Sequence, residues 1–237
     1  MAYAEVFCPR PLRTRFALWG ALLFELREAA FELSDARPTE VKCAWWADEA
    51  LRCAQDAPRH PLTQALAAPQ LPWSALARGI VSGIHADASR PVDREAALAT
   101  VAPLADGIAT VEAALFDVPM TGDASRAVVV HLLCERLRIG LAAADGGRVP
   151  LSLLARHGIT SSALAQSQGV SAVSDWAGEL AAVLPSKMGA IALYRRSRAA
   201  FDGRYLRERA AGRDRRLPSL RALHVAWSSA REGRDTA

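Results

Sequence analysis

The chain has 237 residues, of which 51% are apolar, and a formal net charge of +4 at pH 7. This length supports one large hydrophobic core, so we expect a single domain over 1–237, with an ordered core over about 7–231 and a frayed tail over 232–237. Abundant Ala, Leu and Arg, with few runs of Ile or Thr, suit helices far better than sheets and predict an all-α fold. The sequence has no P-loop, dinucleotide or serine-hydrolase motif, which excludes the enzyme classes built on them.

The cysteines and apolar segments predict reduced thiols and no membrane-spanning helix. Four cysteines form no CxxC pair and follow no cleavable signal: Cys8, Cys43, Cys53 and Cys134. The apolar run 16–24 would rise only about 14 Å as a helix, half of a bilayer core. We therefore expect a cytoplasmic protein, with attachment to the membrane surface as the alternative.

Apolar residues at three- and four-residue spacing, separated by Pro and Gly, predict a series of helices. In chain order they are expected at about 13–33, 40–55, 62–67, 73–84, 93–116, 124–144, 151–157, 170–183, 187–210 and 218–231. Pro38 should separate the first two, with Thr39 as the cap of the second. Pro103 should interrupt or kink the fifth, and a polar loop rich in Ser and Gln should follow Gly158.

The stretch from Arg195 to Arg216 contains nine arginines against three acidic residues. Most faces of this kind are simply solvated, and this is the favoured interpretation. A protein partner or an anionic membrane surface is the alternative. No aromatic-rich RNA signature or helix-turn-helix spacing accompanies the arginines, so no nucleic acid is expected.

Other polar and aromatic residues favour structural roles. His131 and Cys134 lie three residues apart without a second pair at zinc-like spacing, so we interpret them as buried helix side chains. His157 precedes Gly158 and suits a helix C-terminus. Trp19 and Trp45 fall at helical apolar positions and are expected in the core. The spacing leaves open whether such residues fill the core or line an apolar cavity.

The segment from Leu133 to Ser152 reads LCERLRIGLAAADGGRVPLS. It resembles the second aspartate-rich segment of the squalene/phytoene synthase family, whose pattern runs roughly L-T-N-I-L-R-D-V-x-E-D-x-x-x-G-R-x-Y-L-P. Six residues occupy the positions of that pattern: Leu133, Leu137, Arg138, Gly147, Arg148 and Leu151. Where the pattern has Asp, Glu and Asp, this chain has Ile139, Ala142 and Ala143.

Further elements extend the resemblance from about Phe7 to Trp227. They are Ala17-Leu18-Trp19, Trp45-Trp46 with Glu49, His60-Pro61 followed by Ala65-Leu66, and Leu153 to Ile159, which reads LLARHGI. Each is short, and the order and spacing of all of them carry the likeness. The resemblance implies a helical bundle of the isoprenoid synthase type, in which two aspartate-rich helices hold Mg²⁺ and a prenyl diphosphate.

The first aspartate-rich motif of the family should fall near 27–31. Here the nearest carboxylates are Glu25, Glu28 and Glu32, which share one helix face. In the second motif the nearest is Glu135, one turn before Ile139. Mg²⁺ requires several hard oxygen ligands in a fixed arrangement. Because Glu135 is displaced by one turn and has no second carboxylate beside it, these glutamates provide an incomplete set of ligands. Arg148 is the candidate phosphate contact that the resemblance implies, and bracing of its loop is the alternative.

Three functions remain open. The favoured one is a squalene/phytoene synthase-like protein that has lost Mg²⁺-dependent prenyl transfer and works as a binding or assembly factor without a cofactor. The first alternative is an active head-to-head prenyltransferase that binds Mg²⁺ through rebuilt glutamate ligands. The second is a carrier that holds an isoprenoid in an apolar cavity. Close approach of Glu28 and Glu135 would favour the enzyme, whereas a salt bridge from Arg27 in that space would disfavour it.

Overall fold

The computed structural model describes residues 2–32, 36–66, 68–86, 89–140, 148–166, 169–186, 191–214 and 217–231. Every regular element in these ranges is helical, which confirms the predicted all-α class. The elements are α1 (Ala2–Glu5), η1 (Arg10–Leu12), α2 (Arg13–Arg27), η2 (Glu28–Glu32), α3 (Ala36–Ala54), α4 (Pro61–Leu66), α5 (Trp73–Ala86), α6 (Arg94–Leu115), α7 (Gly122–Gly140), α8 (Leu151–Arg156), α9 (Ser161–Ala165), α10 (Val170–Val183), α11 (Leu193–Ala210) and α12 (Ser219–Arg231).

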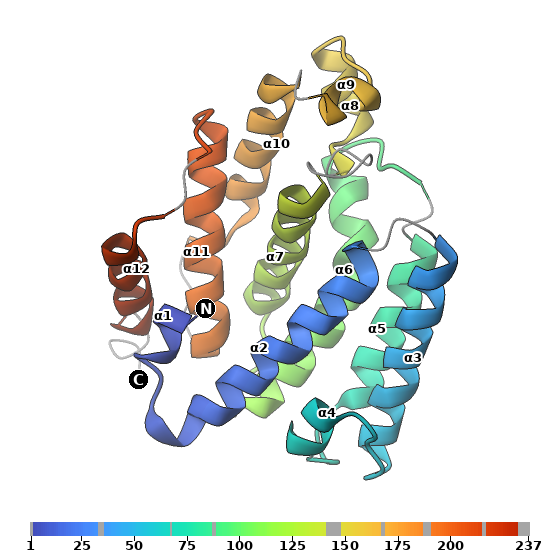
Figure 1. Ribbon diagram of the computed structural model, residues 1–237, viewed down its shortest axis with the longest axis vertical. Helices are drawn as coiled ribbons and strands as arrows, with labels where there is room; N and C mark the ends of the chain where they lie inside the picture. Colours follow the sequence, from blue (N-terminus) through green and yellow to red (C-terminus); the bar gives the residue numbers. More distant parts are fainter. Residues whose placement is uncertain are drawn as a thin grey trace.

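The helices form a bundle in which neighbours in space follow the chain closely (Figure 1). Helix α5 packs between α3 and α6, α6 packs on α7, and α7 packs on α11, which in turn contacts α10 and α12. Helix α2 runs diagonally across the bundle in Figure 1 and continues into η2, a π-helical turn that contacts α3 and α7. The end of α2 is thereby brought against the middle of the bundle.

Tryptophan side chains anchor the core at four positions, of which Trp19, Trp73 and Trp176 are at most 1% exposed and Trp46 is 3% exposed. The expectation for Trp45 is wrong, because this side chain is 38% exposed. The buried stripe of α3 passes through Cys43, Trp46 and Ala50, and Trp45 lies at its edge. Its ring packs edge-on against Trp46 instead, with ring centroids 4.9 Å apart.

Several helix boundaries differ from the predicted ones. Helix α3 begins at Ala36, so Pro38 lies within its first turn, where a missing N–H breaks no hydrogen bond, and Thr39 is not its cap. The predicted polar loop contains α9, which is capped by the Thr160 hydroxyl accepting from the backbone N–H of Ala163. Helix α6 continues through Pro103 without interruption. Residues 141–147 and 187–190, where two predicted helices extend, lie outside the described residues.

Helices α5 and α6 approach closely because each has a glycine at the crossing. A Cβ atom added to Gly79 would lie 2.5 Å from the carbonyl oxygen of Pro103, and one added to Gly107 would lie 2.8 Å from that of Ala75. Both obstructions are backbone atoms, which cannot rotate away. The contact therefore requires glycine at both positions.

Helix α6 is the one described helix that is long and apolar enough to cross a membrane. More than half of its apolar window is buried, since it packs between α5 and α7. A core helix of a soluble protein has the same properties, so this finding does not by itself indicate a membrane span.

Candidate functional site

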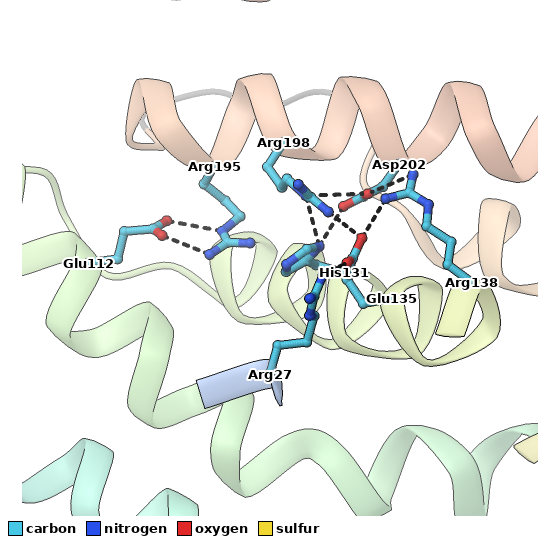
Figure 2. A network of polar contacts seen from close by, with 8 residues as sticks. All are labelled: Arg27, Glu112, His131, Glu135, Arg138, Arg195, Arg198 and Asp202. Carbon is cyan, nitrogen blue, oxygen red and sulfur yellow. Dashed lines mark hydrogen bonds and ion pairs between the residues drawn. The ribbon is translucent and has the colours of Figure 1, made fainter. Parts of the chain in front are cut away.

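An ion pair directly joins α2 and α7, the helices in which the sequence resemblance predicts the two aspartate-rich motifs. Arg27 is the last residue of α2, and its Nη1 lies 2.9 Å from Oε2 of Glu135 on α7. The Arg27 guanidinium also lies over the Phe24 ring, 4.4 Å from the centroid. Figure 2 shows Arg27 reaching from the end of α2 toward the cluster of charged side chains between α7 and α11. A cation thus takes the place between the two motif helices.

Glu135 receives two further guanidinium groups. Arg138, one turn later on α7, and Arg198 on α11 both donate to its Oε1 (Figure 2). The Glu135 side chain is only 5% exposed. Burial alone would raise the pKa of this carboxyl, but the positive charges of Arg198 and Arg138 outweigh that effect and lower the pKa. Glu135 is therefore an ionised carboxylate whose oxygens are both paired.

Asp202 on α11 forms the second centre of the cluster. Its Oδ2 lies 2.9 Å from Nδ1 of His131, and its Oδ1 lies 3.5 Å from Nε of Arg198 and 3.6 Å from Nη2 of Arg138. Although burial opposes ionisation, the positive charge of Arg198 and the His131 hydrogen bond hold the pKa of Asp202 well below its usual range. Asp202 is fully buried and ionised.

His131 is the neutral member of the cluster. Burial lowers the pKa of its imidazole, and the charge of Arg198 lowers it further. Nδ1 of the ring lies between two charged groups, 2.9 Å from Oδ2 of Asp202 and 3.1 Å from Nε of Arg198. The tautomer decides which contact is a hydrogen bond: with its proton on Nδ1 the ring donates to Asp202, and with its proton on Nε2 it accepts from Arg198.

A second ion pair lies beside this cluster and links three helices. Arg195 on α11 donates from Nε and Nη2 to the two oxygens of Glu112 on α6, at 3.0 and 2.7 Å. Trp19 on α2 donates its Nε1–H to the same carboxylate at 2.7 Å. Arg195 is 0% and Glu112 2% exposed. Nη1 of Arg195 is buried and makes no hydrogen bond to a described residue.

Three ligand atoms in the cluster would suit a metal ion by spacing. One ligand atom each from His131, Glu135 and Asp202 lies within 4.8 Å of the others. The oxygens of Glu135 and Asp202 are already paired with three arginines. Three guanidinium groups and two carboxylates together carry a net charge of +1. A divalent cation would have to displace guanidinium groups from buried positions. The residues present therefore suit a closed ion-pair network and do not fit Mg²⁺.

The carboxylates predicted for the first motif form no group of metal ligands among the described side chains. Glu28 Oε1 lies 2.7 Å from Nζ of Lys42 on α3, so Glu28 and Glu135 are held by different cations. Glu25 is partly buried one turn earlier on α2. Glu32 ends η2, and its side chain lies outside the described residues.

The residues predicted for the second motif are only partly described. Arg138 stacks over the Tyr205 ring at 4.2 Å and Ile139 is partly buried. Ala142 and Ala143 lie outside the described residues. Arg148 is partly buried with a left-handed φ of 52°, and its predicted phosphate contact stays a prediction.

The residues that α11 and α6 contribute to the network are not among those predicted from the sequence. The predicted solvated face between Arg195 and Arg216 is wrong for Arg195 and Arg198, whose side chains are 0% and 17% exposed. A signal was present: Arg195, Arg198 and Asp202 share the three- and four-residue spacing of the buried apolar residues Ala199 and Leu206. Charged residues on an apolar stripe indicate buried pairs rather than a solvated face.

Other predictions about single residues are confirmed. All four cysteines are free thiols, and they are buried. His131 and Cys134 are both buried on α7, as interpreted. His157 ends α8, and its Nε2 lies 2.9 Å from Oδ2 of Asp175 on α10.

Two cavities open elsewhere on the described part of the molecule. One, of about 810 Å³, lies between the N-terminal segment and α12, and one of about 330 Å³ lies beside α2 and α4. Neither is lined by a residue of the charged network. The isoprenoid-carrier function needs an apolar cavity of its own, and it stays a prediction.

Comparison with known proteins returned no match to a protein family model, to a curated protein or to a solved structure.

Proposed function

We propose that this chain is a divergent squalene/phytoene synthase-like protein, built as a bundle of the isoprenoid synthase type, that has lost Mg²⁺-dependent prenyl transfer. We propose that it acts instead as a binding or assembly factor for a partner protein. The observation that carries the first proposal is the ion pair between Arg27 and Glu135, where the resemblance would place two carboxylates bridged by metal.

The electrostatics of the network support the loss of metal chemistry. Loss of diphosphate from a prenyl substrate requires cations that neutralise the leaving group, held by protein oxygens. Here Glu135 is saturated by Arg27, Arg138 and Arg198, and Glu28 is occupied by Lys42. The guanidinium groups are in turn engaged with carboxylates, so they are not free to replace the metal. The network stabilises the crossing of the helices. Because its carboxylates are paired with cationic side chains, they are not available as metal ligands.

The carboxyl end of α11 supports the binding role. Arg195 and Arg198 face the core, but Arg207 and Arg213, two or more turns later, are exposed. Among the described residues, the exposed arginines of this stretch therefore lie at the end of α11 and in the turn that follows it. An acidic face on a partner protein is the complement of this surface.

Pyrophosphate release tests the catalytic half of the proposal. The full chain is incubated with farnesyl or geranylgeranyl diphosphate and with Mg²⁺ or Mn²⁺, and no metal-dependent release is expected even at high protein concentration. Metal-dependent release that Glu28→Ala abolishes would instead establish the prenyltransferase alternative.

Native purification tests the binding half. The tagged full chain should recover one partner protein in stoichiometric amounts, and Arg207→Glu with Arg213→Glu should abolish recovery. The matched control reverses two exposed arginines elsewhere, Arg94→Glu and Arg126→Glu, and should keep the partner. Equal loss with both pairs, or no stoichiometric partner, contradicts the proposal.

A further inference from the structure

Helix α12 and the N-terminal segment together form a basic surface at one end of the bundle. Helix α12 contacts α1 and α11, and Figure 1 shows α1 and α12 on the side of the bundle opposite α3. The sequence of α12 is SLRALHVAWSSAR, with two arginines and no acidic residue. Across from it, Arg10 and Arg13 begin η1 and α2. Four guanidinium groups therefore belong to this end of the molecule.

A cavity of about 810 Å³ lies between the two segments. Its lining combines apolar and cationic side chains, among them Val6, Phe7, Arg10, Arg13, Trp227 and Arg231. Arg13 is fixed in place, since its Nε donates to the carbonyl of Cys8 at 3.1 Å and its Nη2 to that of Val6 at 3.3 Å. The guanidinium of Arg231 lies over the Trp227 ring, 4.7 Å from the centroid.

Large apolar side chains project from the same surface. Leu220 is 81%, Val6 60% and Trp227 42% exposed. Leu220 and Trp227 are seven residues apart on α12, so they lie on one face two turns apart. Val6 and Trp227 also line the cavity, so exposed apolar side chains lie directly beside its arginines.

We propose that the surface formed by α12 and residues 6–13 docks on a membrane that contains anionic phospholipid. Arginines meet the phosphate groups, while Trp227, Leu220 and Val6 enter the boundary between headgroups and acyl chains. Tryptophan is favoured at this depth because its ring is apolar and its N–H is polar.

Within residues 2–13 and α12, the described side chains include one acidic residue, Glu5, against four arginines. Glu208 on α11 interacts with Arg221 of α12 but is already paired with Arg204 and Arg213. The surface joins exposed apolar side chains to arginines, and an anionic bilayer complements both, since its phosphates meet the cations and its acyl boundary takes up the apolar groups.

Flotation with vesicles tests the proposal on the full chain. Binding is expected to vesicles of phosphatidylcholine mixed with phosphatidylglycerol, to weaken with added salt, and to be at least about tenfold weaker with phosphatidylcholine alone. Inorganic phosphate at millimolar concentration should not compete more strongly than chloride of equal ionic strength. Equal binding to both vesicle types overturns the electrostatic assignment, and specific competition by phosphate overturns the membrane in favour of a soluble anion.

Paired variants locate the docking surface. Trp227→Ala with Arg231→Glu should reduce vesicle binding at least about tenfold. The matched control, Trp45→Ala with Arg94→Glu, removes a similarly exposed indole and reverses one arginine elsewhere, and should bind as the unchanged chain does. Circular dichroism verifies that both variants are folded. Equal effects of the two pairs, or self-association through α12 that blocks vesicle binding, would refute the assignment.

Discussion

Arg27 and Glu135 are 108 residues apart in the sequence, yet Nη1 of one lies 2.9 Å from Oε2 of the other. The pair joins the end of α2 to α7, where the resemblance implies that metal ions should connect two sets of carboxylates. A direct ion pair holds the helices together without a dissociable cation. The stability of this crossing should therefore depend on Arg27 and Glu135 and not on divalent metals.

Glu135→Ala should destabilise the fold by about 3–5 kcal/mol, because it leaves three guanidinium groups without their shared carboxylate. Arg27→Ala should cost less, about 2 kcal/mol, since Glu135 keeps two partners. Urea unfolding at pH 7 measures both changes. The control is Lys42→Ala, which breaks a half-exposed pair with Glu28 and should cost at most about 1 kcal/mol. A larger loss of stability in Lys42→Ala than in Glu135→Ala would contradict the proposed role of the network.

Asp202 makes the stability of the fold depend on acid pH. Its pKa in the folded protein is far below the ordinary value of 3.8, so the unfolded chain binds the proton more tightly. The stabilisation is thus fully present above about pH 4 and is lost as the pH falls toward the folded pKa. Unfolding free energies at pH 7, 5, 4 and 3 should show Asp202→Asn about 3 kcal/mol less stable at pH 7, with the difference shrinking below pH 4.

Protonation of His131 should also lower the stability of the fold, and it should begin at a higher pH than protonation of Asp202. Its folded pKa is below the ordinary 6.5, so stability should begin to fall as the pH drops below that value. His131→Asn keeps a side-chain N–H that can donate to Asp202 but cannot take up the proton, and it should remove this first part of the decline in stability.

For Asp202 itself, the contrary outcome is a stability difference between Asp202→Asn and the unchanged chain that grows on acidification. That result would show that Asp202 is not held ionised.

The all-α class and most helix positions follow from local signals in the sequence. Apolar spacing located Val170–Val183 without error, because periodicity and caps are local properties. The partners of Glu135 were harder to predict. Arg138 was accessible as an i+3 neighbour, but Arg27 and Arg198 are 108 and 63 residues away. Such pairs depend on how α2 and α11 cross α7, which no spacing within one helix contains.

The glycines at the crossing of α5 and α6 give a test of packing that is separate from charge. Gly79→Ala and Gly107→Ala should each destabilise the fold by about 1–3 kcal/mol, since the new methyl group meets backbone atoms at 2.5 and 2.8 Å. Gly122→Ala at the start of α7 is the control, because nothing lies within 4 Å of its added Cβ. That change should leave stability unchanged or slightly raised. Thermal unfolding followed by circular dichroism ranks the three variants.

The pair between Arg195 and Glu112 should behave as one unit. Glu112→Leu leaves a fully buried guanidinium unpaired, and Arg195→Met leaves Glu112 with Trp19 as its donor. Each single change should cost about 3–5 kcal/mol, because an uncompensated charge stays in the core. The double variant removes both charges and should be less destabilised than either single variant, with the unpaired Trp19 N–H as the main remaining cost. A double-mutant cycle in urea gives the coupling energy, and additive effects would mean that the two side chains are not paired in solution.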